Sequence, residues 1–77
     1  MRAMTIEERD ITKDIDRLLD RGGRIVTLHQ GSEWRATWTF TVDLAPWTRM
    51  VEETGDSEER AIFDATRKAI AILDNPR

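Results

Sequence analysis

The most regular hydrophobic pattern in the chain runs from Trp34 to Leu44, where every second residue is apolar. The apolar phase comprises Trp34, Ala36, Trp38, Phe40, Val42 and Leu44. The polar phase comprises Arg35, Thr37, Thr39, Thr41 and Asp43. Because successive side chains of a strand point to opposite faces, this alternation predicts a strand over 34–44 with one buried and one wet face. That length exceeds the usual ~5–6 residues, so we expect one end to bend or to extend past its neighbours.

Two shorter segments predict further strands. Residues 24–30 are rich in β-branched and other apolar side chains, and Gly31-Ser32 gives a turn signal before the long strand. The dipeptide Ala45-Pro46 should end the long strand, because proline cannot donate to a ladder. A weaker pattern over 49–54 is interpreted as a short third strand.

A helix is predicted over residues 5–21. Its apolar positions recur at helical spacing: Met4, Ile11, Ile15, Leu18 and Leu19. Thr5 and Glu8 have the spacing of a capping box, in which each side chain bonds the other residue's amide. Gly22-Gly23 supplies the stop signal.

A second helix should begin at a cap formed by Asp56 or Ser57 and end at Asn75-Pro76. Its apolar stripe is Ile62, Ala65, Ala69 and Leu73. The small alanines would let this helix approach a sheet closely.

The predicted order is therefore helix, strand, strand, strand, helix within a single domain over 1–77. The simplest architecture is an α+β fold, with a three-stranded antiparallel sheet and two helices packed on one face. The other face would carry Arg35, Thr37, Thr39 and Thr41, and would be open to water or to a partner.

Composition narrows the functional classes. The chain has no cysteine and one histidine, so we expect no disulfide, no metal site and no cofactor. The formal net charge of −3 argues against a free-standing nucleic-acid binder, which is usually basic. No apolar run approaches the roughly 20 residues that span a bilayer, and the N-terminus lacks a signal-peptide core. We therefore expect a cytoplasmic protein without a membrane association.

The order of the elements resembles that of the double-stranded-RNA-binding domain, and this resemblance of topology covers the whole chain. In that family RNA binding rests on a lysine cluster that opens the second helix. The matching positions here hold Ser57, Glu58, Glu59 and Arg60. The resemblance implies the αβββα fold, whereas acidic groups at these positions would repel phosphate.

The run Gly55-Asp56-Ser57-Glu58-Glu59-Arg60-Ala61-Ile62, followed by Ala69-Ile70, resembles the strand-to-helix junction of HicB-type antitoxins and related small domains. That resemblance implies an antitoxin component. In size and acidic charge the chain is also similar to small inhibitors made by phages and mobile elements, of which anti-CRISPR proteins are the best-known group. That similarity implies an inhibitor and transfers no residue roles.

Residues with catalytic potential are few. His29 is the only histidine, and we interpret it as a half-exposed strand residue, with a general base as the alternative. The sequence shows no glycine-rich phosphate loop, no acidic cluster with metal-ligand spacing and no nucleophile elbow. We therefore predict that the protein is not an enzyme.

Candidates for binding a partner are more numerous. Five acids fall within eight residues: Glu52, Glu53, Asp56, Glu58 and Glu59. They either serve helix-start electrostatics and solubility or form an acidic patch for a basic surface, such as a nucleic-acid-binding groove blocked by mimicry. Trp47, which follows Pro46, either fills the core or anchors a partner as an exposed aromatic residue.

The first predicted helix carries a basic ridge at four-residue spacing: Arg9, Lys13, Arg17 and Arg21. Aspartates flank this ridge at positions that allow weak ion pairs along the helix. The ridge is either a solvated face or a basic stripe for phosphate or an acidic partner. In the second case Arg67 and Lys68 would extend it.

Together these observations predict a protein-binding module that inhibits a nucleic-acid-handling protein complex. The predicted contact residues are Trp47, Glu52, Glu53, Asp56, Glu58, Glu59, Arg35, Thr37 and Thr39. Three alternatives remain open at this point. They are a nucleic-acid-binding module of the double-stranded-RNA-binding type, a HicB-like antitoxin component, and a homodimer joined through the edge or open face of the sheet.

Overall fold

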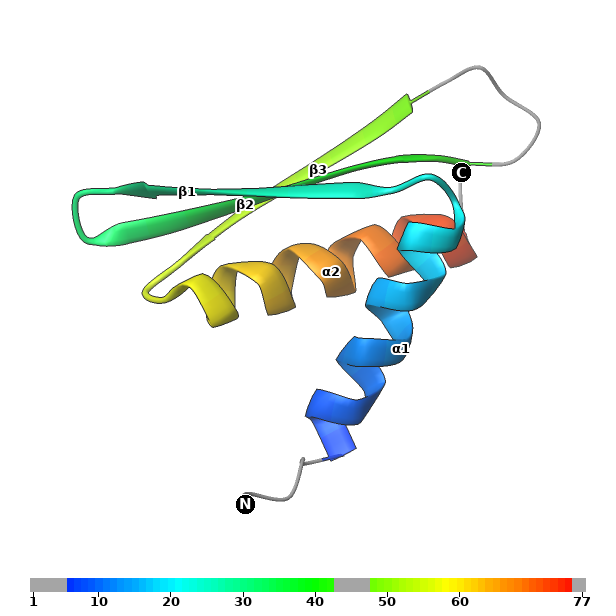
Figure 1. Cartoon of the computed structure of the whole chain (residues 1–77), viewed down its shortest axis with the longest axis horizontal. Helices are drawn as coiled ribbons and strands as arrows, with labels where there is room; N and C mark the ends of the chain where they lie inside the picture. Colours follow the sequence, from blue (N-terminus) through cyan, green and yellow to red (C-terminus); the bar gives the residue numbers. More distant parts are fainter. Residues whose placement is uncertain (1–5, 43–47, 76–77) are drawn as a thin grey trace.

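The computed structural model describes residues 6–42 and 48–75 of the chain. The elements follow the order α1 (Ile6–Asp20), β1 (Arg24–Gln30), β2 (Glu33–Thr41), β3 (Thr48–Gly55) and α2 (Glu58–Asp74). The strands form one antiparallel sheet in the order β1-β2-β3, and both helices lie on the same side of it (Figure 1). The predicted α+β fold is confirmed. None of the described helices is long and apolar enough to cross a membrane.

The boundaries differ from the predicted ones in one informative place. β2 ends at Thr41, whereas the alternating pattern predicted a strand over 34–44. Thr41 is also the last residue of β2 with a partner, because it pairs with Thr48 at the start of β3. Val42 continues the apolar phase and packs against the core. Residues 43 and 44 of the predicted strand lie outside the described residues.

Glycines set the two tight connections before β2. Gly22 has φ 73°, and the amide of Gly23 donates to the carbonyl oxygen of Leu18 at 2.8 Å, which closes the end of α1. A Cβ added at Gly23 would lie 2.4 Å from that same oxygen, so only glycine fits there. Gly31 has φ 61° in the two-residue turn that joins β1 to β2, a conformation that most other residues adopt at a cost.

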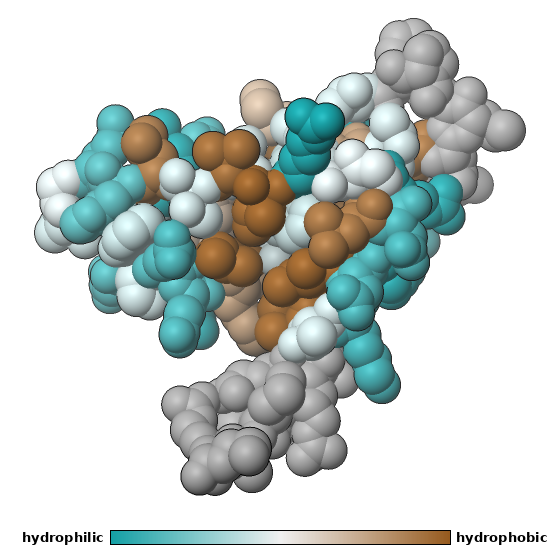
Figure 2. Space-filling model, in the orientation of Figure 1, coloured by the Kyte–Doolittle hydropathy of each residue, from teal (hydrophilic) through white to brown (hydrophobic). Residues whose placement is uncertain are grey.

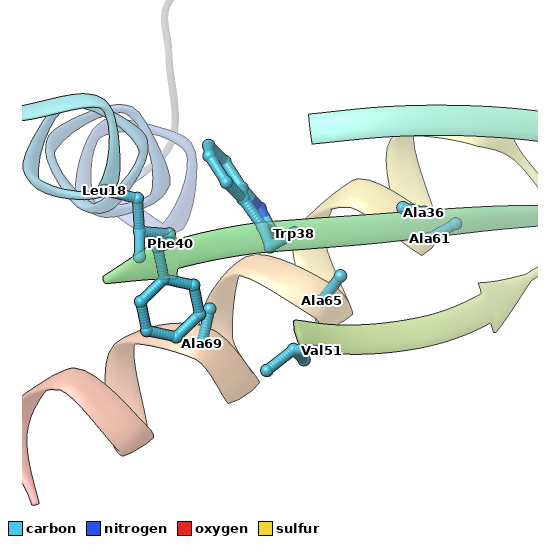
Figure 3. Packing of buried hydrophobic residues seen from close by; sticks show 8 residues of the cluster. All are labelled: Leu18, Ala36, Trp38, Phe40, Val51, Ala61, Ala65 and Ala69. Carbon is cyan, nitrogen blue, oxygen red and sulfur yellow. The ribbon is translucent and has the colours of Figure 1, made fainter. Parts of the chain in front are cut away.

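The core lies between the apolar face of β2 and α2 (Figure 3). Trp38, at the centre of β2, pairs with Ile25 on β1 and Val51 on β3 and is completely buried. Its indole Nε1 donates to Thr66 Oγ1 of α2 at 2.8 Å, which satisfies both polar groups inside the core. The remaining buried apolar side chains of the described structure are Leu18, Ala36, Phe40, Val51, Ala61, Ala65 and Ala69.

The buried residues of α2 are Ala61, Ala65, Thr66 and Ala69. Ala65 and Ala69 belong to the predicted stripe, whereas its other members, Ile62 and Leu73, are only partly buried against the core. Ser57 caps the helix, since its Oγ accepts a hydrogen bond from the amide of Arg60 at 3.1 Å. α1 packs mainly on α2, and its Leu18 brings the last turn of α1 into the core. Both helices therefore leave the opposite face of the sheet without a described covering element.

Candidate docking surface on the open sheet face

The open face of the sheet is built by the residues that alternate with the buried side chains. On β2 these are Arg35, Thr37 and Thr39. The strand register places their neighbours on either side, so that Thr37 lies between Val26 of β1 and Glu52 of β3. By the same register, the open face comprises Arg24, Val26, Leu28 and Gln30 of β1, Glu33, Arg35, Thr37, Thr39 and Thr41 of β2, and Thr48, Met50, Glu52 and Thr54 of β3.

Three large apolar side chains of this face are solvent-exposed. The exposed fractions are 66% for Val26, 48% for Leu28 and 70% for Met50. Single exposed apolar residues are ordinary on protein surfaces. Here three of the four exposed large hydrophobics in the described structure share one sheet face, and the fourth, Leu19, lies on α1. Val26 and Leu28 are neighbours on β1, whereas Met50 lies on β3 beyond the threonines of β2. Together they give this face exposed apolar side chains that another macromolecule could contact.

One ion pair crosses this face. Arg35 Nε lies 3.1 Å from Glu52 Oε1, and both side chains are nearly half-exposed. An exposed pair of this kind contributes about 0–1 kcal/mol to stability, so its main effect is to leave the centre of the face close to neutral. Threonine hydroxyls on both sides of the pair can donate and accept hydrogen bonds. The centre of the surface thus combines apolar side chains, neutral polar groups and one mutually compensated charge pair, and Arg24 and Glu33 lie at its ends along β1 and β2.

The predicted acidic cluster is divided by the strand geometry. Glu52 and Glu53 are successive residues of β3, so Glu52 joins the open face while Glu53 points to the helix side, where Lys68 Nζ lies 3.2 Å from its Oε1. Glu58 Oε2 accepts a hydrogen bond from Thr27 Oγ1 at 3.0 Å. Asp56 and Glu59 are exposed at the junction between β3 and α2. Of the predicted contact residues, the structure therefore brings Glu52 together with Arg35, Thr37 and Thr39.

Two other predicted features have different positions. Trp47 lies outside the described residues. His29 is an exposed residue of β1, and its ring stacks on the Trp34 ring with 4.3 Å between centroids and 3° between planes. These two residues are direct cross-strand partners beside the hairpin turn, so the stack gives His29 a structural role. Within residues 6–42 and 48–75, no group of histidine and acidic side chains could hold a metal ion.

The basic ridge of α1 borders a cleft of about 420 Å³ between α1 and α2. Arg17 donates to Asp74 across this cleft, and this hydrogen bond lowers the pKa of Asp74 and raises the pKa of Arg17. Arg67 Nη1 lies 3.7 Å from Asp14 Oδ2. Two of the cations that the sequence offers for phosphate are thus engaged by aspartates of the same chain.

Sequence reasoning missed the apolar members of the open face. The pattern places Val26 and Leu28 on one face of β1 but does not by itself say which face. The turn contains that information, because a two-residue connection through Gly31-Ser32 pairs Gln30 with Glu33 and therefore Leu28 with Arg35.

Comparisons with known proteins add no relative. No protein-family model, curated protein or solved structure matches this chain.

Proposed function

We propose that this protein is a non-enzymatic, cytoplasmic binding module that docks on another protein through the open face of its sheet. The observation that carries the proposal is the exposure of Val26, Leu28 and Met50 on a face that no described element covers. The partner we propose is a nucleic-acid-handling protein complex, which the module inhibits in the manner of phage or mobile-element inhibitors.

The composition of the open face supports a protein partner. Interface cores are depleted in charge, and methionine adapts its shape to a partner more readily than a branched side chain does. Met50 and the threonines fit that description, and the Arg35–Glu52 pair offers both signs of charge for hydrogen bonding.

Charge supports a basic partner. The chain carries a net charge of −3, and Asp56 and Glu59 are exposed at the end of β3. A surface that binds nucleic acid is basic, so acidic groups beside the docking face would accelerate encounter with it. In this proposal the apolar side chains of the open face supply affinity, and Asp56 and Glu59 orient the partner.

The first experiment substitutes one exposed apolar residue on the face and one away from it. Met50→Lys places a charge on the open face, while Leu19→Lys makes the same change at a comparably exposed position on α1. A partner captured from a host lysate and then purified should bind Met50→Lys at least ~10-fold more weakly than the wild type, as for a contact residue that contributes more than about 1.4 kcal/mol. Leu19→Lys should bind like the wild type. Equal binding of both variants, or no specific partner, would refute the proposal.

A second experiment addresses the acidic junction. Reversing Asp56 and Glu59 to lysine should slow association with a basic partner and leave dissociation nearly unchanged, because exposed charges act mainly on encounter. The same variant should lose most of the salt dependence of the association rate. An unchanged association rate would show that these two acidic residues do not attract the partner.

Direct nucleic-acid binding is the rival function, and the helix cleft with Lys13, Arg17 and Arg67 is the place for it. Arg17 and Arg67 already face aspartates, which reduces the positive field available to a phosphate. A gel shift at low salt separates the two functions. A shift that weakens steeply with salt would favour the rival, including a HicB-like antitoxin that binds nucleic acid.

A further inference from the structure

The outer edge of β1 is the second unpartnered feature of the sheet. β1 is an edge strand, since the sheet order is β1-β2-β3 and the first helix leaves this edge for α2. Its seven residues contain no proline, glycine or lysine. An edge strand exposes backbone N–H and C=O groups that can pair with another chain, and proteins usually protect such edges with charges, prolines or bulges.

The opposite edge is protected in this way. β3, with the sequence TRMVEETG, carries three charged residues, Arg49, Glu52 and Glu53, and Asp56 follows its end. Two of these acids are tied into the molecule, because Glu52 pairs with Arg35 and Glu53 pairs with Lys68. The edge formed by β1 instead presents Val26 and Leu28, and brown apolar surface extends over the β1 region and toward the helices in Figure 2.

The sequence of β1 is self-complementary in one antiparallel register. A two-fold axis perpendicular to the sheet keeps the open faces of both copies on the same side. Opposed residues of the two β1 strands must then belong to the same face, so the axis lies at the position of a residue and not between two residues. An axis at Thr27 is the choice that pairs all seven residues of β1, and any other centre shortens the ladder. In that register Arg24 faces Gln30, Ile25 faces His29, and Val26 faces Leu28 of the second copy.

The side chains fit this register on the open face. Val26 and Leu28 of each copy would become cross-strand neighbours at the axis, forming one cluster of four aliphatic side chains. Directly opposed aliphatic residues contribute favourably to strand pairing. Each of these residues is about half-exposed or more in the single chain, so pairing removes their flanks from water.

The charges at the ends of the ladder also fit. Arg24 would face Gln30 of the second copy, and Gln30 pairs within its own chain with Glu33 of β2. Arg24, Gln30 and Glu33 lie on the same face of the sheet, so the arginine of one copy is directed toward the glutamate of the other. The two-fold axis repeats this opposite-charge arrangement at both ends.

One contact opposes the pairing. Glu58 Oε2 accepts a hydrogen bond from Thr27, which lies on the axis, so the two Glu58 carboxylates approach each other on the helix side. Their repulsion is screened by salt. The association should therefore strengthen as ionic strength rises, the reverse of a nucleic-acid complex.

We infer that two copies of this chain associate through antiparallel pairing of β1 centred on Thr27, which joins their sheets into one six-stranded sheet. The pairing uses the edge and leaves the upper surface of the open face accessible. Val26 and Leu28 belong to both surfaces, because pairing covers only their outer flanks. The tests of the pairing contain no other protein, so its failure and the failure of the docking function are distinguishable.

The first test compares charges at the two edges. Sedimentation equilibrium of the full chain should give a concentration-dependent mass that approaches twice the 8.9 kDa of the monomer. The double substitution Val26→Lys/Leu28→Lys should raise the dimer Kd at least ~10-fold, because it places like charges across the axis. Met50→Lys, the matched change beside the other edge, should leave the Kd unchanged. A wild type that stays monomeric, or a double variant that dimerises normally, overturns the inference.

The second test fixes the register and does not depend on a disruptive variant. The chain contains no cysteine, so Thr27→Cys introduces a single thiol at the axis. Directly opposed residues of antiparallel strands have Cα atoms about 4.5–5.5 Å apart, within the range of a disulfide. Mild oxidation should link Thr27→Cys rapidly into covalent dimers, and Thr54→Cys on β3 should not link at that rate. Equal linkage of the two variants, or none for Thr27→Cys, overturns the proposed register.

Discussion

The two faces of the sheet are made by the same three strands, yet they have opposite physical character. On the helix side Trp38, Ala36 and Phe40 are buried under α2, and the polar atoms there are paired. On the open face the residues between them, such as Thr37 and Thr39, remain partly exposed beside Val26 and Met50. The comparison teaches that one face holds the fold together while the other is free to vary or to bind. Substitutions should therefore divide sharply by face.

The largest expected effect is on the helix side. Trp38→Ala should lower the free energy of unfolding by ~3–5 kcal/mol, because it removes the largest buried side chain and leaves a cavity under α2. In a domain of this size that loss approaches the whole stability. Thr39→Ala, a change at the adjacent residue of β2 on the open face, should alter this free energy by less than about 0.5 kcal/mol. Chemical denaturation followed by circular dichroism measures both values. A comparable loss for the two variants would contradict the division by face.

A smaller effect is expected for the polar contact inside the core. Thr66→Val keeps the shape of the side chain but removes the hydroxyl that accepts from Trp38 Nε1. The indole N–H is then buried without a partner, which costs about 1–3 kcal/mol. Thr66→Ser, which retains the hydroxyl, is the control for the hydrogen bond and should recover part of that loss. If valine were neutral at this position, the hydrogen bond would not be holding α2 to the sheet.

Much of the division between a buried and an open sheet face could be predicted from the sequence, because side chains of a strand alternate between the two faces. The alternation from Trp34 onward assigned Trp38 and Phe40 to the core and the threonines to the open face. The same rule separates Glu52 from Glu53, although their proximity in sequence suggested one acidic patch. Neighbouring residues of a strand point to opposite faces of the sheet, so two acids that are adjacent in sequence lie on different sides of the molecule.

Other features depend on contacts between distant parts of the chain. The alternating pattern continues past Thr41, but β2 ends there, at the last pair that the described residues of β2 and β3 form. Likewise, the periodicity of α1 shows that it has an apolar side without showing that this side packs mainly on α2. Both outcomes are decided by tertiary neighbours, which a local pattern does not contain.

The N-terminus of α2 lies at the junction with β3, and from there the helix runs over the core side of the sheet. Ser57→Ala removes the oxygen that accepts from the Arg60 amide, and should cost about 1 kcal/mol of unfolding free energy. Ser57→Asp keeps an acceptor and should stay near the wild-type value. Thermal denaturation of the three proteins tests this order. An alanine variant as stable as the wild type would mean that packing, and not the Ser57 cap, stabilises the first turn of α2.

The smallest effect is expected at the exposed Arg17–Asp74 pair that joins α1 to α2. The hydrogen bond from Arg17 lowers the pKa of Asp74 from its ordinary value of 3.8. The folded state therefore holds this carboxylate charged more readily than the unfolded state does, and the pair stabilises the fold at pH above 3.8. As pH falls through the lowered pKa, Asp74 becomes protonated and that stabilisation is lost.

Asp74→Asn should accordingly be slightly less stable than the wild type at neutral pH, and the difference in free energy of unfolding should disappear in acid. Both side chains are about half-exposed, so added salt should also shrink the neutral-pH difference. A difference that persists at pH 2, measured by urea denaturation, would mean that asparagine disturbs the packing of α1 on α2 and that the charge pair is not the cause.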